Sequence, residues 1–425
     1  MKFKKYIWSR LFILNIIFIL IMWLFNNPLN GPISNYYILF SRITALVGTY
    51  LILIQLVLIG RIKFLENLYG HDKLTRFHHY NGIVAFFLIL LHGIFIILGY
   101  KIIYQISFFA QFATYLGSDE ISSAIIALFL LIIAVITSIK FAKMKIKYEY
   151  WFIIHLITYI VIILAFGHQL EKGLDLRNTV FYAYWIILYI VTVGLLVIYR
   201  LLIPLYNFYK HRFEVSKIVI ENKDITSVYI TGYNMDQFKF NGGQFGLFRF
   251  LSGWLSIESH PFSFSHNYSG NEIRITVKNL GDFTSKIKNI KKGTKVFIEG
   301  PLGVFNKKEI TKKNVLFIAG GIGITSINSL IGDLKNTNLN LNLIYSVKKE
   351  DDFVFKKELE SINCKYHVSS KEGRLSKEII QKYILNKKDI DVFICGPPMM
   401  NKHLLKILKE IGVLKKNIHF EMFSF

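Results

Sequence analysis

The chain has 425 residues, of which 53% are apolar and 16% aromatic, and its formal net charge is +23. Its mean hydropathy of +0.40 excludes a disordered chain, which has few large apolar residues, and predicts membrane spans, because an ordinary soluble domain of this length does not reach it. Two cysteines and 28 glycines exclude a disulfide framework and a collagen.

Six apolar windows in the first half of the chain predict membrane-spanning helices. Each is about 17–24 residues long, roughly what a hydrocarbon core of ~30 Å requires. The windows are Trp8–Phe25, Tyr37–Gly60, His78–Tyr100, Ser122–Ile139, Trp151–Gly167 and Val180–Ile198. Because no small-residue cleavage site follows the first window, we interpret it as an uncleaved anchor. Residues 1–212 are therefore expected to form a six-helix domain of a multi-pass protein in the cell membrane.

Basic residues mark one side of this predicted bundle. Segments 1–10, 60–77, 140–150 and 200–210 together hold 14 Lys and Arg residues, whereas the loops on the other side hold four. By the positive-inside rule, both termini face the cytoplasm. The second half has no basic stripe interleaved with aromatics, so no nucleic-acid partner is expected.

Four histidines lie within or at the ends of the predicted third and fifth helices, where ionisable side chains are costly and therefore functional candidates. His78 and His92 are separated by a rise of roughly 21 Å, and His155 and His168 by roughly 20 Å. Both helices run from inside to outside, so the residues pair by depth into an inner and an outer bis-histidine site. Such sites suit haem iron. The alternative is that neighbouring helices satisfy each ring as an ordinary interior histidine.

Three details of the membrane half remain open. His79 competes with His78 as the inner ligand, although the 14-residue spacing to His92 favours His78. Thirteen residues turn about 220° around an ideal helix, so the fifth-helix pair shares a face only if that helix is distorted. Arg42, at the outer entrance of the second helix, either reaches towards the headgroups or points into the bundle and pairs with a haem propionate.

Beyond Arg212 the pattern changes to short strands. A first group predicts an antiparallel β-barrel, domain 213–311, with strands Phe213–Ile220, Ile225–Ile230, Phe245–Phe250, Ile273–Val277 and Lys295–Glu299. A second group alternates with helices and predicts a parallel α/β sheet, domain 312–425, with strands Val315–Ala319, Leu341–Val347, Cys364–Val368 and Val392–Cys395. Both cysteines lie in this half, predicted to be cytoplasmic, so they are expected to be reduced thiols.

Three motifs in the second half carry chemistry. The glycines of Gly320-Gly321-Ile322-Gly323-Ile324-Thr325 let the backbone approach a pyrophosphate at a helix N-terminus. His260-Pro261-Phe262-Ser263 offers a hydroxyl and an aromatic to a flavin ring, and Lys278 with the turn Gly281–Thr284 offers a site for its phosphates. Cys395-Gly396-Pro397 ends the last sheet strand at the carboxyl edge, where α/β sheets bind ligands. Each motif alone is also compatible with a turn or a core aromatic.

In this order, the motifs and the helical histidines resemble the ferric-reductase-like transmembrane superfamily, which includes the NADPH oxidases, joined to a ferredoxin–NADP reductase-type dehydrogenase. Phe77-His78, Gly82 and His92-Gly93 resemble its third-helix haem signature and support His78 over His79. Ser326 stands where the family commonly has proline. The resemblance implies FAD, two b-type haems and NADPH or NADH as cofactors, with His78, His92, His155 and His168 as the haem ligands.

The same resemblance implies roles for three further residues. Ser263 would lie near flavin N5, Cys395 would lie beside the nicotinamide, and the terminal aromatic Phe425 would cover the flavin. NADPH is favoured over NADH by Ser346, Lys348 and Lys349 after the second sheet strand, although the acidic residues 350–352 follow them.

The resemblance therefore implies an NAD(P)H oxidoreductase that carries electrons through FAD and two haems to a small-molecule acceptor at the outer face. Oxygen, reduced to superoxide, is the expected acceptor, because the short outer loops offer no domain for a bulky ligand; a ferric chelate is the alternative. Apart from the lipid bilayer, no obligate protein partner is inferred. Two rival classes remain. One is a transporter or channel with a regulatory soluble half, which haem-free purified protein would support. The other is a haem- or quinone-linked electron-transfer subunit with a partner dehydrogenase, against which the complete dehydrogenase in the same chain argues.

Overall fold

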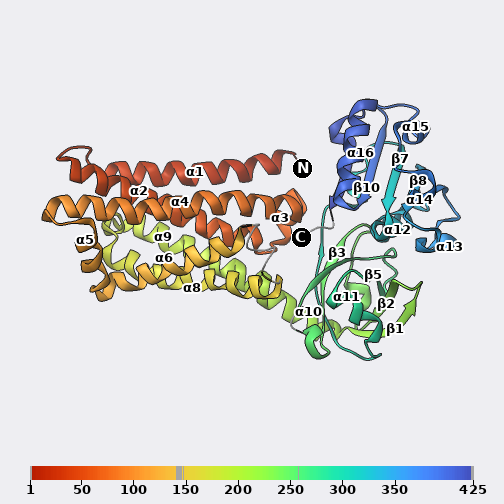
Figure 1. Cartoon of the computed structure of the whole chain (residues 1–425), viewed down its shortest axis with the longest axis horizontal. Helices are drawn as coiled ribbons and strands as arrows, with labels where there is room; N and C mark the ends of the chain where they lie inside the picture. The colour runs from red at the N-terminus through yellow and green to blue at the C-terminus, as the bar shows by residue number, and fades with distance from the viewer. Residues whose placement is uncertain (1, 140–145, 147, 257, 423–425) are drawn as a thin grey trace. The chain divides into compact units, whose positions relative to one another are not determined.

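The computed structural model describes residues 2–139, 146, 148–256 and 258–422. The chain forms two compact units: Met1–Ile62 with Lys73–Tyr199, and Lys63–Asp72 with Arg200–Phe425 (Figure 1). The short segment Lys63–Asp72 connects two predicted membrane helices in the sequence but belongs to the second unit. The predicted domain borders at residues 212 and 311 stay predictions.

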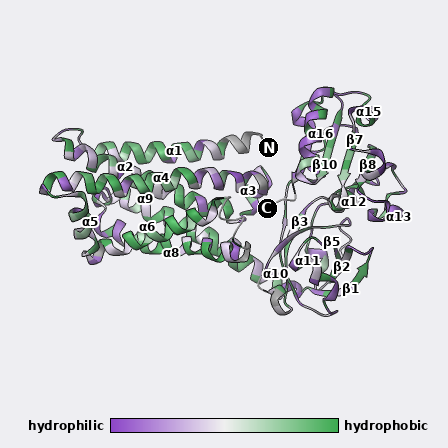
Figure 2. Cartoon of the chain, in the orientation of Figure 1, coloured by the Kyte–Doolittle hydropathy of each residue, from purple (hydrophilic) through white to green (hydrophobic). Residues whose placement is uncertain are grey.

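The first unit is a bundle of long helices that lie side by side (Figure 1). Its helices are α1 (Lys2–Asn26), α2 (Ile33–Ile59), α4 (His71–Tyr104), α5 (Phe108–Leu116), α6 (Asp119–Ser138), α8 (Tyr148–Lys172) and α9 (Thr179–Leu196), with a 3-10 turn η1 (Leu174–Arg177). In the part of the chain that is described, six helices are long and apolar enough to cross a membrane. They coincide with the six predicted windows, and Figure 2 shows them hydrophobic along most of their length. The predicted multi-pass helical fold is confirmed.

Side-chain caps explain where two of the helices begin, and a proline explains where the backbone hydrogen bonding changes after α9. Ser107 caps α5 by accepting a hydrogen bond from the amide of Ala110 (3.1 Å), which separates this short helix from α4. Asn178 caps α9 in the same way. After α9 the chain passes through a π-helical turn, η2 (Val197–Leu202), into α10 (Ile203–His211). Pro204 at the start of α10 has no amide hydrogen, so a regular α-helical bond is lost there.

The barrel of the second unit contains six antiparallel strands. They are β1 (Glu214–Ile220), β2 (Ile225–Thr231), β3 (Phe245–Phe250), β4 (His260–Ser263), β5 (Ile273–Lys278) and β6 (Val296–Leu302). Two sheets, ordered β1-β2-β5 and β4-β3-β6, are joined by the bridges Glu214↔Lys295 and Phe264↔Ile275, which close the barrel. The predicted barrel is confirmed; its interior is filled by buried aromatics such as Phe213, Phe248 and Phe250.

The α/β part of the second unit is a five-stranded parallel sheet ordered β11-β10-β7-β8-β9. Its strands are β7 (Asn314–Gly320), β8 (Asn340–Val347), β9 (Asn363–Val368), β10 (Ile390–Gly396) and β11 (Ile418–Met422). The helices are α12 (Ile324–Leu334), α13 (Lys356–Leu359), α14 (Ser369–Glu372), α15 (Lys377–Gln381) and α16 (Pro398–Ile411). β7 and β10 are buried on both faces, which explains their continuous apolar sequence. The predicted parallel sheet is confirmed.

Besides α10, two further short helices belong to the second unit. α11 (Asp282–Lys286) follows β5, and α3 (Lys63–Tyr69) comes from the segment between the second and third long helices. Sequence patterns did not predict α3. Its buried Leu65 and Leu68 show that it packs as part of the unit rather than as an exposed loop.

Candidate cofactor sites

The four predicted histidine ligands meet in two pairs between α4 and α8. The ring centres of His78 and His155, the first histidine pair, are 6.1 Å apart. Those of His92 and His168, the second histidine pair, are 6.5 Å apart. A metal between two imidazoles requires about 6 Å, because each metal–nitrogen bond takes about 2 Å and each nitrogen lies about 1 Å from its ring centre. The residues present therefore fit two bis-histidine haem sites.

Three of the four rings are held by a hydrogen bond at Nδ1. The acceptors are the Gln55 carbonyl for His78 (3.2 Å), Ser41 Oγ and the Ser41 carbonyl for His92 (2.9 and 3.1 Å), and Ser138 Oγ for His155 (3.1 Å). A metal-bound imidazole usually donates its second ring N–H to such an oxygen, which fixes the ring and leaves the other nitrogen facing the metal. Sequence reasoning missed Ser41, Gln55 and Ser138, which lie on other helices.

The structure bears on two details that the sequence left open. His78 faces His155, whereas His79 is exposed and its ring stands beside Tyr80. The inferred distortion of the fifth helix does not take the form of a break, because α8 is one uninterrupted α-helix from Tyr148 to Lys172. Both α8 histidines nevertheless lie close to their α4 partners, with ring centres 6.1 and 6.5 Å apart.

Arg42 pairs with an acidic residue that the sequence analysis did not suggest. Its Nε lies 2.8 Å from Asp175 Oδ2 and its Nη2 lies 2.8 Å from Asp175 Oδ1. Asp175 is buried and also accepts a hydrogen bond from the Asn27 side chain (2.7 Å). This bidentate ion pair accounts for the charge of Arg42 within the bundle, and the headgroup and propionate interpretations stay predictions.

The predicted flavin motif and the predicted phosphate turn come together in the barrel. The His260 ring centre lies 3.8 Å from that of Phe283, and the Phe262 ring centre lies 6.2 Å from it. Ser263 Oγ is buried and, among the residues that the structure describes, has no hydrogen-bond partner. An unsatisfied buried hydroxyl costs about 1–3 kcal/mol, so this atom suits a polar group of a bound flavin.

In the predicted phosphate turn, one residue stabilises the turn and two others are accessible to a ligand. Thr284 Oγ1 accepts hydrogen bonds from the amides of Leu280 (2.9 Å) and Gly281 (3.0 Å), so this hydroxyl closes the turn itself. Open space surrounds Gly281, where an added Cβ would meet no atom within 4 Å. Lys278, half-buried at the end of β5, supplies the cationic group.

The glycine loop and the Cys395 segment meet at the carboxyl edge of the parallel sheet. Cys395 pairs with Ala319 across β10 and β7, and a Cβ at Gly323 would lie 2.2 Å from the Cys395 carbonyl oxygen. Gly321 has a φ of +55° and faces open space, so backbone there is accessible to a ligand. The structure thus brings both predicted nucleotide-binding motifs together.

The remaining residues of these two motifs have packing roles. Thr325 donates a hydrogen bond to the Ile322 carbonyl (2.9 Å), which tightens the loop entering α12. Gly396 lies against Gly320, where an added Cβ would come within 3.1 Å of the Gly320 Cα. A Cβ at Gly320 would lie 3.0 Å from Pro397 Cδ. These close approaches require glycine at both strand ends.

Neither described cysteine forms a disulfide, as predicted. Burial raises the pKa of the Cys364 thiol to about 11, so this thiol stays protonated and unreactive at neutral pH. Phe425, predicted to cover the flavin, lies outside the described residues, and its role stays a prediction.

Segment Lys63–Asp72 contributes a contact that the sequence did not reveal. The carboxyl Oε1 of Glu66 lies 2.8 Å from Nδ1 of His71, and both side chains are buried. The His71 ring meets the Phe245 ring edge-on at 6.1 Å. Phe245 in β3 pairs with Ser263 in β4. The segment therefore packs one strand away from the candidate flavin serine.

A partly buried polar cluster joins the barrel to the α/β part. Arg274 of β5 donates two hydrogen bonds to Glu358 of α13, at 2.7 and 2.8 Å, and one to the Ser265 carbonyl (2.7 Å). Asn328 of α12 bonds the same carboxylate (2.6 Å) and the same carbonyl (2.9 Å). Burial by itself raises the pKa of the Glu358 carboxyl, but these hydrogen bonds and the arginine charge outweigh it and lower that pKa. The cluster therefore fixes the position of the barrel relative to the α/β part, and with it the two parts of the candidate site.

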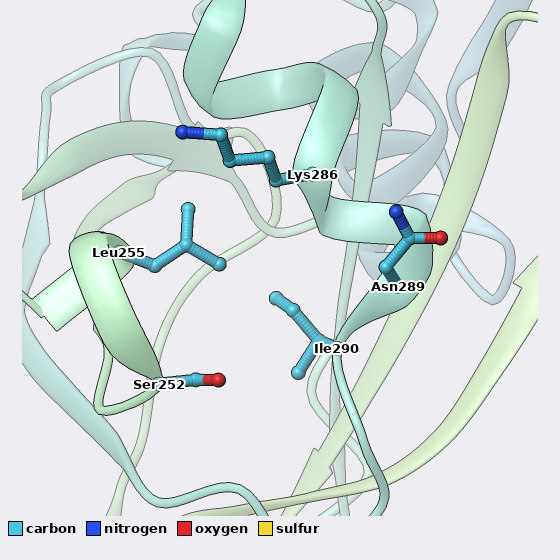
Figure 3. Close-up of a pocket in the computed structure, with 5 residues that line it drawn as sticks. All are labelled: Ser252, Leu255, Lys286, Asn289 and Ile290. Carbon is cyan, nitrogen blue, oxygen red and sulfur yellow. The ribbon is translucent and has the colours of Figure 1, made fainter.

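A cavity of about 230 Å³ lies in the barrel at the far end of α11 from Gly281 (Figure 3). It is lined by Ser252, Leu255, Lys286, Asn289 and Ile290. Leu255 and Ile290 belong to the barrel core, so the cavity is a depression over that core. None of the predicted flavin residues lines it.

Three stretches of the chain match known protein families. Residues 44–166 match the ferric reductase like transmembrane component, 210–306 an FAD-binding domain, and 317–406 an oxidoreductase NAD-binding domain. These matches and the fold define a class, the multi-pass membrane proteins that carry flavin and nicotinamide-nucleotide domains of oxidoreductases. Within that class, the chain has the ferric reductase and NADPH oxidase-like architecture with a ferredoxin–NADP reductase-type dehydrogenase.

Characterised relatives match only part of the chain. The chain is 31% identical over 154 residues to flavohemoprotein B of Dictyostelium discoideum, covering 32% of this chain and 36% of that protein. It is 25% identical over 240 residues to the glycine betaine monooxygenase reductase subunit of Chromohalobacter salexigens, covering 51% and 64%. The matches thus span between about a third and two thirds of these relatives. Among solved structures, a ferredoxin NADP+ reductase from Neisseria gonorrhoeae aligns over 50% of this chain and 99% of its own, with 15% identity and a TM-score of 0.44.

Proposed function

We propose that the chain transfers electrons across a membrane from NAD(P)H, by way of FAD and two b-type haems, to a small acceptor at the opposite face. The supporting observation is the spacing of the two histidine pairs, 6.1 and 6.5 Å between ring centres, in a chain that continues into FAD and NAD domains. By the distribution of basic residues, the nucleotide side is the cytoplasm and the membrane is the cell membrane.

When bound, these cofactors supply the hydride and one-electron chemistry; the chain binds and orients them. The two histidine pairs would be the axial ligands of the haems. Ser263 would hydrogen-bond the flavin with the hydroxyl that otherwise lacks a partner, and Phe262 would pack against its ring. The loop from Gly320 to Gly323 and the amides at the start of α12 would hold the pyrophosphate of the nucleotide, with Cys395 beside the nicotinamide.

Oxygen, reduced to superoxide, is the acceptor that the observations favour. An anionic ferric chelate would be attracted by a cationic group near the second histidine pair, and Arg42 is the neighbour of Ser41, which bonds His92. Asp175 balances the charge of Arg42, so this arginine favours no anion over a neutral oxidant. Ferric reduction remains the second candidate, since residues 44–166 match the ferric reductase component.

NADPH is the proposed donor. Lys348 and Lys349 are exposed after β8, where the 2′-phosphate would lie. Glu350, which follows them, is paired with Lys371 at 2.9 Å, so its charge opposes the two lysines less than the sequence suggests. Steady-state kinetics with a higher kcat/KM for NADH would contradict this choice.

The test of the proposed function is NAD(P)H oxidation by proteoliposomes that contain the purified full chain. Under air, we expect turnover with superoxide-dismutase-sensitive reduction of cytochrome c. Under argon, turnover should stop unless a ferric chelate is added. Full turnover with the chelate under argon, and negligible superoxide under air, would identify a ferric reductase; protein that purifies without haem would contradict the entire proposal.

A further inference from the structure

Three pairs of adjacent lysines lie at the amino edge of the parallel sheet, where its strands begin. Lys312-Lys313 precedes β7, Lys387-Lys388 precedes β10 and Lys415-Lys416 precedes β11. These strands are parallel neighbours in the order β11-β10-β7, so the three pairs meet at one edge and span about 10 Å across the strands. We call these six residues the lysine edge. It lies at the opposite end of the sheet from the glycine loop.

Most of the charge of the lysine edge is not balanced by carboxylates. Lys312 lies 3.8 Å from Asp389, whereas the other five lysines are exposed and form no ion pair with any described residue. Asp391, the next acidic residue of β10, is fully buried and accepts hydrogen bonds from the amides of Thr311 and Lys312. The acidic residues 350–352 follow β8 at the carboxyl edge. The surplus of lysines is therefore a local feature of the amino edge as well as a consequence of the basic composition.

Two leucines protrude beside these lysines. Leu385 is 98% exposed and lies two residues before Lys387, and Leu414 is 40% exposed and lies directly before Lys415. A single exposed leucine is ordinary on a protein surface. Basic residues that flank exposed apolar side chains, however, suit a bilayer surface, because anionic headgroups attract the charges and the headgroup boundary buries the apolar groups.

The lysine edge continues into a depression beside Lys312-Lys313. Its volume is about 560 Å³. The lining includes three lysine side chains and three apolar ones, Lys307, Lys312, Lys313, Ile310, Leu334 and Leu339. Cationic and apolar groups in one depression match the headgroup region of an anionic lipid, which carries both a phosphate and the start of its acyl chains.

We propose that the lysine edge, together with Leu385 and Leu414, docks the nucleotide-binding part onto the anionic surface of the membrane that the helices span. A bilayer is the favoured occupant, because the six spans keep the second unit close to one. The distribution of basic residues assigns this unit to the cytoplasm, where the membrane leaflet is anionic. Each lysine near such a surface strengthens the association about fivefold. This docking goes beyond the proposed electron transfer and depends on neither the haems nor the acceptor.

The test is hydrogen–deuterium exchange of the full-length protein in nanodiscs. One set contains phosphatidylcholine alone, and the other contains phosphatidylcholine and phosphatidylserine in equal parts. We expect segments 385–388 and 412–416 to exchange at least fivefold more slowly in the anionic discs. The difference should disappear at about 1 M salt, where the Debye length falls to about 3 Å.

Two variants separate the charges from the apolar contacts. The difference between the discs should disappear in the fourfold variant Lys387→Gln, Lys388→Gln, Lys415→Gln, Lys416→Gln. It should become smaller in Leu385→Ser, Leu414→Ser. A matched control removes four charges from other exposed positions of the second unit and should leave the difference unchanged: Lys291→Gln, Lys292→Gln, Lys356→Gln, Lys357→Gln.

Equal exchange of both segments in the two kinds of disc would overturn the proposal. Protection that appears in neutral discs only after poly-glutamate is added would assign the lysine edge to an acidic protein and would also overturn the membrane as its occupant. Loss of the difference in the control variant would show a general effect of net charge and would overturn the assignment to this edge. Because the measurement requires neither haem nor turnover, its outcome is separate from that of the proposed function.

Discussion

Phe245 lies between His71, whose ring meets its edge at 6.1 Å, and Ser263, its partner across β3 and β4. A segment that leads into the third long helix thus touches the strand next to the candidate flavin serine. Gly70, at a φ of +79°, turns the chain there, and an added Cβ would lie 3.0 Å from Val304 Cγ2. The segment is therefore part of the barrel's packing rather than a passive linker.

We expect Glu66→Leu to loosen this segment. The substitution leaves the buried Nδ1 of His71 without its carboxylate, and an unsatisfied buried group costs about 1–3 kcal/mol, or about 5–150-fold in a local opening equilibrium. Hydrogen–deuterium exchange of residues 63–72 in the full chain should accelerate by such a factor, whereas the exposed Glu410→Leu should leave it unchanged. Unaltered exchange in Glu66→Leu would show that the segment is held by its leucines alone.

The double variant His92→Ala, His168→Ala should bind one haem in place of two. Removing the second pair leaves the first pair intact, because the histidines of each helix are separated by roughly 20 Å. Reduction of FAD by NAD(P)H should survive, since it takes place in the second unit, while transmembrane electron transfer should be lost. A haem-to-protein ratio that stays at two would show that the ligands are assigned wrongly.

The Arg274–Glu358 pair predicts an acid-sensitive contribution to stability. The folded-state pKa of Glu358 is lowered, so its stabilisation is fully present above the unfolded pKa of about 4.3 and is lost as pH falls through the folded value. Compared with wild type, Glu358→Gln should melt a few degrees lower at pH 7, a modest effect because the side chain is 39% exposed. The difference in melting temperature should shrink as the pH is lowered from 7 to 3. An equal difference at both pH values would exclude the ionised carboxylate as its source.

Gly323→Ala should impair nucleotide binding more than Gly321→Ala. A methyl group at Gly323 would overlap the Cys395 carbonyl oxygen at 2.2 Å, so α12 or β10 must shift. At Gly321 the space is open and the cost is the left-handed backbone, roughly 1–2 kcal/mol. We expect the Kd for NADPH to rise at least tenfold in Gly323→Ala, with FAD content as the control. Equal affinities in the two variants would mean that the loop tolerates the shift.

The sequence alone predicts the membrane spans, the barrel, the parallel sheet and the candidate site residues of this protein. Membrane helices, alternating strands and a glycine loop are patterns of neighbouring residues, so hydropathy and spacing along the chain suffice to find them. The same holds for the four histidines, because equal spacing on two helices predicts pairing by depth. The six spans, the barrel and the parallel sheet are found in the structure at the predicted positions.

Only the tertiary structure decides which atoms those residues meet. Ser41 is 51 residues from His92, and Asp175 is 133 residues from Arg42; no local pattern connects such partners. The choice of His78 over His79 depends on which side of α4 faces α8, and the packing of segment 63–72 depends on a barrel more than 140 residues further along the chain. Helix crossing and side-chain packing set these contacts. A buried polar group needs a hydrogen-bond partner, and the packing decides which oxygen of a neighbouring helix lies within reach.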